Sequence, residues 1–188
     1  MIFHIQQEEK LDEQAFIRGR IVAHALPPEL TQEEFEKWWP YLTDKEREKW
    51  AVYETHNIIT LNGRNAILNY VGNDSLSGTG TTGTACTAFT QYFSAGTGAI
   101  ASVSAGDTTM VGELYRAVPS SATVTGNSVN ISTFFSAGVA NGNYTNSGIW
   151  GSNASGTLGS GLLVTHALYN YTKTNANSLT SSYILNLN

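Results

Sequence analysis

Apolar and polar residues alternate with a period of two in the second half of the chain. The alternation is clearest in residues 129–135 and 179–187, where apolar residues return at most odd-numbered positions. Because successive side chains of a strand point to opposite faces, this pattern predicts half-buried β-strands. Residues 161–172 are apolar on both faces, which predicts a central strand or a strand covered by a partner.

The N-terminal part of the chain follows a different pattern. Apolar residues recur at approximately helical spacing within residues 8–25 and stop at a Pro-Pro pair, which predicts a first α-helix. Two Thr-x-x-Glu sequences, at residues 31–34 and 43–46, have the spacing of capping boxes and predict two short helices. Residues 62–72 predict one more helix that ends at a glycine.

These patterns predict a mainly β chain with an N-terminal α-helical segment. Short strands separated by turn sequences such as Asn141-Gly142 favour an antiparallel β-sandwich or a jelly roll. We expect three parts: a helical attachment arm in residues 1–55, a helix and a Gly/Ser/Thr-rich linker in residues 56–88, and a β-sandwich domain in residues 89–188.

Charge is as unevenly distributed as hydropathy. Of 25 charged side chains, 19 lie in residues 1–55 and 6 in residues 56–188, with a net charge of −5. A neutral sheet surface without a basic stripe binds phosphates poorly, so we expect no nucleic-acid partner. No stretch approaches the roughly 20 apolar residues of a transmembrane helix, and the start lacks the pattern of a signal peptide. We therefore expect no membrane insertion and no secretion.

Large aromatic residues accumulate in the predicted arm. They are Phe35, Trp38, Trp39, Trp50 and Tyr53. Helices as short as these cannot bury three tryptophans alone, and two interpretations stay open. The helices either form a cap that packs on the chain's own β-domain, or they form a docking arm that buries its aromatic residues in a neighbouring subunit.

Residues able to do acid–base chemistry are scarce in the β-domain, so we expect no catalytic residue. Asp107, Glu113 and Arg116 are assigned to a structural ion pair, because Glu113 and Arg116 stand at a spacing of three residues. Cys86 stands alone, and no group of metal ligands is present in the sequence. Residues 78–83 match the glycine spacing of a dinucleotide site but lack the strand and helix that such a site needs. We expect no cofactor and no metal.

Short motifs in a fixed order carry a resemblance to a known group of proteins. They are Asn57-Ile-Ile-Thr with Gly63-Arg-Asn-Ala-Ile-Leu; Tyr92-Phe-Ser-Ala-Gly-Thr-Gly; Asp107-Thr with Glu113-x-x-Arg116; Ser132-Thr-Phe-Phe with Ala140-Asn-Gly-Asn-Tyr and Gly148-Ile-Trp-Gly; and Ser160-Gly-Leu-Leu-Val with Tyr171-Thr-Lys-Thr and Leu179-Thr-Ser-Ser-Tyr. Over residues 57–188 the chain resembles small structural proteins of tailed-bacteriophage virions, which are tail-fibre, baseplate-associated or capsid-decorating components.

The resemblance implies a non-enzymatic virion component, made in the host cytoplasm, that is anchored to the particle through residues 1–55. The partners implied are copies of itself and other virion proteins of the capsid, neck or tail. The two apolar faces of residues 161–172 favour a homotrimer or another closed oligomer.

The alternative is a receptor- or glycan-binding module of a tail fibre that contacts a host-surface glycan. Its candidate contacts are Tyr144, Trp150, Tyr169 and Tyr171, because aromatic rings offer flat apolar faces to sugars. A carbohydrate-cleaving enzyme is a third class, and it would require Asp107 and Glu113 to form a carboxylate pair in a cleft.

Overall fold

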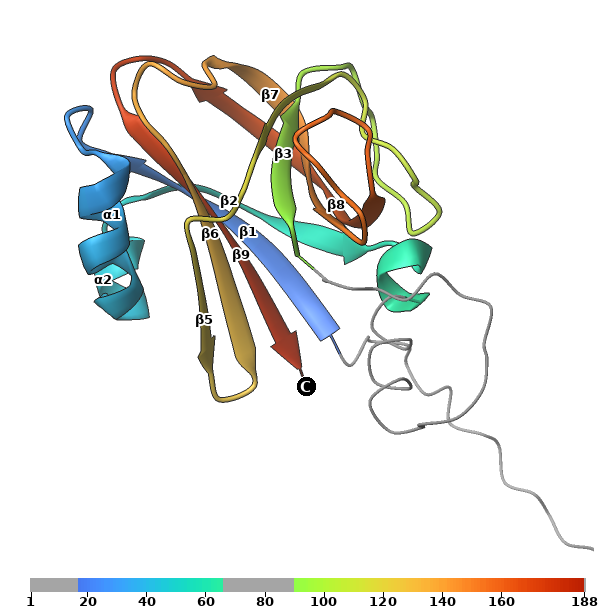
Figure 1. Cartoon of the computed structure of the whole chain (residues 1–188), viewed down its shortest axis with the longest axis horizontal. Helices are drawn as coiled ribbons and strands as arrows, with labels where there is room; N and C mark the ends of the chain where they lie inside the picture. The colour runs from blue at the N-terminus through green and yellow to red at the C-terminus, as the bar shows by residue number, and fades with distance from the viewer. Residues whose placement is uncertain (1–16, 66–89, 188) are drawn as a thin grey trace, which may run out of the picture.

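A computed structural model describes residues 17–65 and 90–187 of the chain (Figure 1). Its strands are β1 (Ile17–Leu26), β2 (Ala51–Ile59), β3 (Tyr92–Gly96), β4 (Glu113–Ala117), β5 (Ser121–Thr125), β6 (Ser128–Phe135), β7 (Gly142–Gly151), β8 (Leu162–Lys173) and β9 (Ser178–Leu187). Between β1 and β2 lie α1 (Gln32–Trp38), the 3-10 helix η1 (Trp39–Tyr41) and α2 (Asp44–Glu48). The prediction of a mainly β chain is confirmed.

The strands form one antiparallel sheet in the order β4-β3-β7-β8-β2-β1-β9-β6-β5. The strands predicted over residues 129–135, 161–172 and 179–187 are present as β6, β8 and β9. β8 lies inside the sheet between β7 and β2, which explains why both of its faces are apolar. The first of the two explanations for residues 161–172, a central strand, is therefore confirmed.

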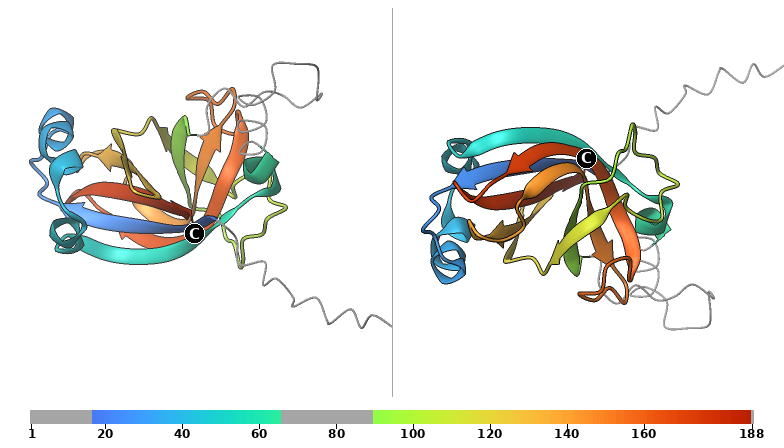
Figure 2. Two further views of the ribbon diagram at one scale, coloured as in Figure 1. Left: turned by 90° about the horizontal axis from the view of Figure 1, so that it is seen from below. Right: turned by 90° about the horizontal axis from the view of Figure 1, so that it is seen from above.

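The chain's connections require the sheet to curl. β4 and β5 are the two ends of the strand order, yet residues 118–120 alone connect them. In a flat sheet these strands would lie about 38 Å apart, whereas the connection spans at most about 14 Å. The sheet therefore bends back on itself, and Figure 2 shows its two halves spread around a common interior. It is a single curled sheet, and the predicted sandwich or jelly roll is not established by these connections.

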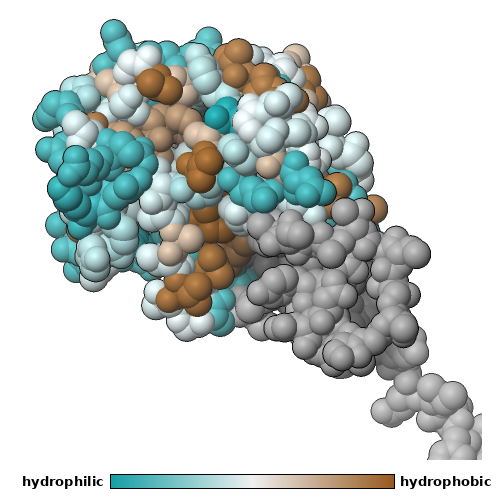
Figure 3. All heavy atoms as spheres, viewed as in Figure 1, coloured by the Kyte–Doolittle hydropathy of each residue, from teal (hydrophilic) through white to brown (hydrophobic). Residues whose placement is uncertain are grey.

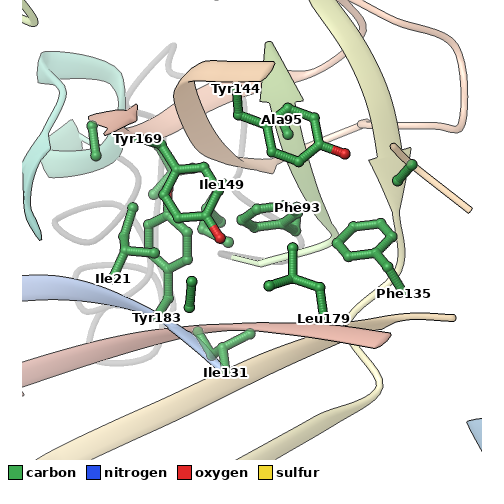
Figure 4. Packing of buried hydrophobic residues seen from close by; sticks show 14 of the residues in the cluster. Ile21, Phe93, Ala95, Ile131, Phe135, Tyr144, Ile149, Tyr169, Leu179 and Tyr183 are labelled. Atoms are coloured by element: carbon green, nitrogen blue, oxygen red, sulfur yellow. The ribbon is translucent and has the colours of Figure 1, made fainter. Parts of the chain in front are cut away.

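The main core lies between the two halves of the curled sheet (Figure 4). Phe93 of β3 contacts Phe135 of β6 and Tyr183 of β9, with ring centroids 5.7 and 5.8 Å apart. Two of the buried tyrosines have hydrogen-bond partners: the Tyr169 hydroxyl lies 2.7 Å from Ser181 Oγ, and the Tyr183 hydroxyl lies 3.2 Å from Ser147 Oγ. The hydroxyl of Tyr144, which is also buried in this core, has no partner among the described residues. Pairing with serine compensates the burial of the first two hydroxyl groups.

The two predicted capping boxes are confirmed. Thr31 Oγ1 accepts the Glu34 N–H at 3.2 Å, and the Glu34 carboxylate accepts the Thr31 N–H at 2.9 Å. Thr43 and Glu46 repeat both contacts at the start of α2. Because each carboxylate accepts the backbone N–H and hydroxyl of its threonine, the pKa of Glu34 and of Glu46 is lowered.

The prediction of a first helix over residues 8–25 is wrong where the structure describes it. Residues 17–26 form β1, which pairs with β2 on one side and β9 on the other. Apolar residues on both faces of this inner strand imitate helical spacing. At Gly19 the neighbouring strand approaches closely: an added Cβ would lie 1.9 Å from the side-chain oxygen of Asn57, and that side chain would have to move.

The predicted three-part division of the chain is also changed. β2 spans the boundary at residue 55, and β1 and β2 lie in the interior of the sheet, so residues 17–55 are part of it. Residues 61–65 are helical. The rest of the helix predicted over residues 62–72, and the linker up to residue 88, lie outside the described residues.

Candidate functional site

Two of the five arm aromatics are buried in the chain's own fold. Phe35 and Trp39 pack against Leu26 and Phe134 in a second cluster on the outer face of the sheet. The Phe35 ring stacks at 4.9 Å on Phe134, and the Trp39 indole N–H donates to Ser132 Oγ at 3.0 Å. For these residues the structure corresponds to the cap and not to a docking arm.

The other three arm aromatics differ in exposure. Tyr53 packs edge-on against Tyr169 of the main core, and Trp38 is partly buried at the rim of the cap. Trp50 is 37% exposed, and another aromatic residue, Tyr41 of η1, is 83% exposed. Sequence reasoning missed Tyr41, which follows Pro40 in η1 and whose exposure no periodic pattern signals.

The aromatic residues expected to contact a glycan are interior residues. Tyr144, Trp150 and Tyr169 are at most 2% exposed, and Tyr171 is partly buried against the main core. Burial raises the pKa of the Tyr144 and Tyr169 hydroxyls. Tyr144, Trp150 and Tyr169 present no face to solvent on which a sugar could stack, and Tyr171 alone of the four is partly exposed.

The predicted ion pair between Glu113 and Arg116 is confirmed. Arg116 Nε lies 2.7 Å from Glu113 Oε1, and the two side chains are 1% and 7% exposed. Glu113 also accepts from Ser94 Oγ and, at 2.6 Å, from the Gly159 N–H. The Arg116 guanidinium lies 4.4 Å from the Trp150 ring and donates to the loop after β7, with Ser155 O and Ser160 O as acceptors. The pair fixes β4 to that loop.

Asp107 does not join this pair, contrary to the sequence-based assignment. Its Oδ2 lies 2.6 Å from His166 Nδ1 on β8. The other ring nitrogen of His166 faces the side-chain oxygen of Asn146 at 3.3 Å, and Asn146 Nδ2 donates to Val111 O. Burial raises the pKa of Asp107, but hydrogen bonds from the Ser104 N–H and from His166 outweigh it and lower the pKa.

The Asp107–His166 arrangement has a plain structural role. The far ring nitrogen of His166 faces the Asn146 side chain, and neither recorded partner of the ring is the hydroxyl of a serine or the thiol of a cysteine. The contacts instead hold the loop of residues 97–112 against β7 and β8. Asp107 and Glu113 serve different partners, and each is held by hydrogen bonds of its own.

Lys173 is a buried cation that sequence reasoning missed. It is 3% exposed, and its Nζ donates to Ser136 O, Ala137 O and Asn141 Oδ1 at 2.9–3.1 Å. Burial lowers the pKa of this ammonium group. These three hydrogen bonds join the connection between β6 and β7 to the end of β8.

A groove on the outer face of the sheet lies between α2 and the β5–β6 hairpin. Figure 1 labels α2, β5 and β6, the elements that border it. Its cavity has a volume of about 400 Å³, and a second cavity of about 60 Å³ extends it towards His24. Arg20, Ile184 and Asn130 are adjacent in register on β1, β9 and β6 and form the floor. Arg47 of α2 lines the wall of both cavities.

The ends of the sheet are its second open surface. β4 and β5 each pair on one side, and no further strand pairs with them among residues 17–65 and 90–187. Four exposed apolar side chains lie in or beside these strands: Val111, Leu114, Val118 and Val124. Figure 3 shows apolar surface over the part of the sheet that carries β5 and β6. β5 contains no charged residue, and charges are what usually discourage pairing at an edge.

Within the described residues, no group of three or more His, Cys, Asp and Glu side chains is placed to hold a metal ion. No helix in the same part of the chain is long and apolar enough to cross a membrane. Cys86 and the glycines of residues 78–83 lie outside the described residues. Comparison with protein-family models, with characterised proteins and with solved structures finds no match to this chain.

Proposed function

We propose that the chain is a non-enzymatic structural component of a tailed-phage virion that associates with copies of itself. The resemblance of residues 57–188 to virion proteins motivates the proposal, and the open apolar edges of the sheet carry it. Each edge offers unpaired backbone groups beside exposed valine or leucine side chains. Such an edge pairs readily with a strand of another chain. The expected assembly is a homotrimer or another closed oligomer.

We also propose that the curled sheet serves as a sandwich-like or jelly-roll unit, because its two halves close over one core. Attachment to the capsid, neck or tail would use the cap formed by α1, η1 and α2. On this surface, Tyr41 and Trp50 are the aromatic residues exposed enough to bury in another virion protein. Phe35 and Trp39 support the cap from within.

The oligomeric state tests the self-association directly. We expect the purified protein to scatter light as a closed oligomer at micromolar concentration, and Val124→Lys to shift it towards the monomer. A lysine at this edge position adds a charge that a paired strand would have to desolvate. Val139→Lys is the control, because Val139 is also exposed, at 50% against 75% for Val124, but belongs to the connection between β6 and β7 and not to an edge strand. A wild-type protein that is monomeric at all micromolar concentrations would overturn the proposal.

Location on the particle is tested separately. Mass spectrometry of purified virions should find the protein at a fixed copy number, and an image reconstruction should place it on the capsid, neck or tail. Tyr41→Ser with Trp50→Ser should reduce its incorporation without changing its melting temperature. Full incorporation of this double variant would show that the cap is not the attachment surface.

A second role is the binding of a receptor or glycan. The groove beside α2 supports it, in place of the aromatic residues that the sequence suggested. The aromatic residues first considered for it are buried, but the groove beside α2 is open and lined by polar side chains. This role is compatible with a structural place in the virion.

A further inference from the structure

The groove beside α2 is built mainly from residues on the outer face of four adjacent strands. One row across the sheet runs Arg20, Ile184, Asn130 and Thr123, and each residue pairs in register with the next. The row beside it contains Asn186, Ser128 and Thr125. A regular sheet holds these side chains at fixed spacing, so the floor of the groove is preformed.

The floor presents hydrogen-bond donors in preference to acceptors. The side-chain oxygen of Asn130 accepts from Ser132 Oγ at 3.2 Å, and the side-chain oxygen of Asn186 accepts from Ser128 Oγ. Among the described residues no protein group accepts from the NH2 group of either amide. Arg20 Nη1 forms an ion pair with Glu54 Oε1 at 3.1 Å, and the Arg20 side chain is 37% exposed. These groups together offer several N–H donors to a ligand rich in oxygen atoms.

The larger cavity has an excess of positive charge, since Arg20 and Arg47 line it together with Asp44. The smaller cavity adds Glu48 and Glu54, so this excess is confined to the larger one. Arg47 donates to Asp44 Oδ1, Trp39 O and Pro40 O, and its side chain is 10% exposed. The side chain of Arg20 is more exposed, at 37%, and makes one ion pair, with Glu54, so Arg20 is the cation better placed to meet a carboxylate.

Two buried polar atoms of the lining lack partners. Arg47 Nε and His24 Nδ1 make no hydrogen bond with the described residues, and their side chains lie in the wall of the smaller cavity. Burial lowers the pKa of His24 to about 4, so the ring is neutral at physiological pH. Buried polar groups without partners are uncommon in a folded protein, and a ligand or an ordered water molecule is one explanation for them. Other buried atoms of the described residues also lack partners, among them the Tyr144 hydroxyl and Trp150 Nε1, so these two atoms are compatible with a ligand in the groove and do not require one.

The rim supplies a flat apolar surface. Tyr41 is 83% exposed and stands between Pro40 and Leu42, which both line the larger cavity. Hydroxyl-bearing Thr123 and Thr125 stand across the groove from it. A volume of about 400 Å³ lies within the usual range for small-molecule sites.

We propose that this groove binds an acidic saccharide, with its carboxylate at Arg20 and its hydroxyl groups on the amides of Asn130 and Asn186. The carboxylate meets the Arg20 guanidinium, the hydroxyl oxygens accept from the two NH2 groups, and the apolar face of a sugar ring meets Tyr41. The inference gives a site to the second role above and does not depend on assembly into a virion.

Titration calorimetry on the full chain tests the proposal with three probes: a trisaccharide of galacturonic acid, neutral triacetylchitotriose and inorganic phosphate. We expect the acidic trisaccharide to bind and the neutral one to bind at least about tenfold more weakly, because it lacks the charged hydrogen bond to Arg20. Arg20→Gln should weaken binding of the acidic probe by at least about tenfold as well. Asn130→Ala should also weaken binding of the acidic trisaccharide, although this substitution leaves the charge of the groove unchanged.

Lys37→Gln is the control, because Lys37 is an exposed cation on α1 outside the groove. It should leave affinity unchanged, and all variants should keep the wild-type melting temperature. The proposal fails if no acidic saccharide binds at millimolar concentration, if the neutral sugar binds equally, or if Lys37→Gln has the effect of Arg20→Gln. Phosphate that binds as tightly as the saccharide would identify an anion site without sugar recognition. Light scattering of the same samples reports on self-association independently.

Discussion

Glu113 and Arg116 are almost wholly removed from solvent, and the carboxylate has two further hydrogen-bond donors in Ser94 and Gly159. We predict that Glu113→Gln lowers the free energy of unfolding by about 3 kcal/mol, because it leaves the guanidinium buried without a counter-charge. Urea denaturation at neutral pH measures the change. Glu33→Gln is the matched control: Glu33 pairs with Lys37 at the same 2.7 Å, but both side chains are exposed. An equal loss in both variants would contradict the prediction.

His24 makes stability depend on pH. Its pKa is lowered by burial from 6.5 to about 4, so the unfolded chain takes up a proton in this range and the folded chain does not. Stability is therefore complete above pH 6.5 and falls as the pH drops towards 4, by about 3 kcal/mol at most. We predict that His24→Gln flattens the unfolding free energy between pH 7 and pH 5. His56→Gln, a change at an exposed histidine, should keep the wild-type slope.

At the scale of elements, the loop of residues 97–112 is held by Asp107 through His166. The pKa of Asp107 is lowered, so its contribution is present above its ordinary value of 3.8 and is lost as the pH falls through the folded-state value. We predict that Asp107→Asn speeds hydrogen exchange and proteolysis in this loop at neutral pH, while β1 and β9 keep their protection. Asp44→Asn on α2 should not affect the loop. Unchanged exchange in the loop would show that other contacts hold it.

Local signals predicted some elements well. The capping boxes needed only a threonine and a glutamate three residues apart, and apolar residues returned at most alternate positions of β6 and β9. The same reasoning was wrong for β1, because strand pairing on both sides overrides helical spacing. The long-range site contacts left no local signal: His166 and Asp107 are 59 residues apart, and the groove combines residues from six separate elements.

At the scale of the whole molecule, the first 55 residues contribute the inner strand β1 and the first half of β2. We predict that a fragment of residues 56–188 does not fold, since removing β1 leaves β9 with an unpaired edge inside the sheet. Circular dichroism should show no cooperative thermal transition. Adding a peptide of residues 17–59 should restore one by strand complementation. A fragment that melts cooperatively alone would mean that residues 1–55 are a separate unit.

The short connection of residues 118–120 is a place where the chain could be cut in order to open the curled sheet. Ile17 and Leu187 are register partners, so a brief linker could join them and the chain could begin and end between β4 and β5 instead. Every strand would keep its neighbours, but the strap that draws the two ends of the sheet together would be gone. Strand pairing determines the order of the sheet, whereas the connection of three residues limits how far its two ends can separate. In the opened chain, closure would depend on the core contacts alone, such as those of Phe93 with Phe135 and Tyr183.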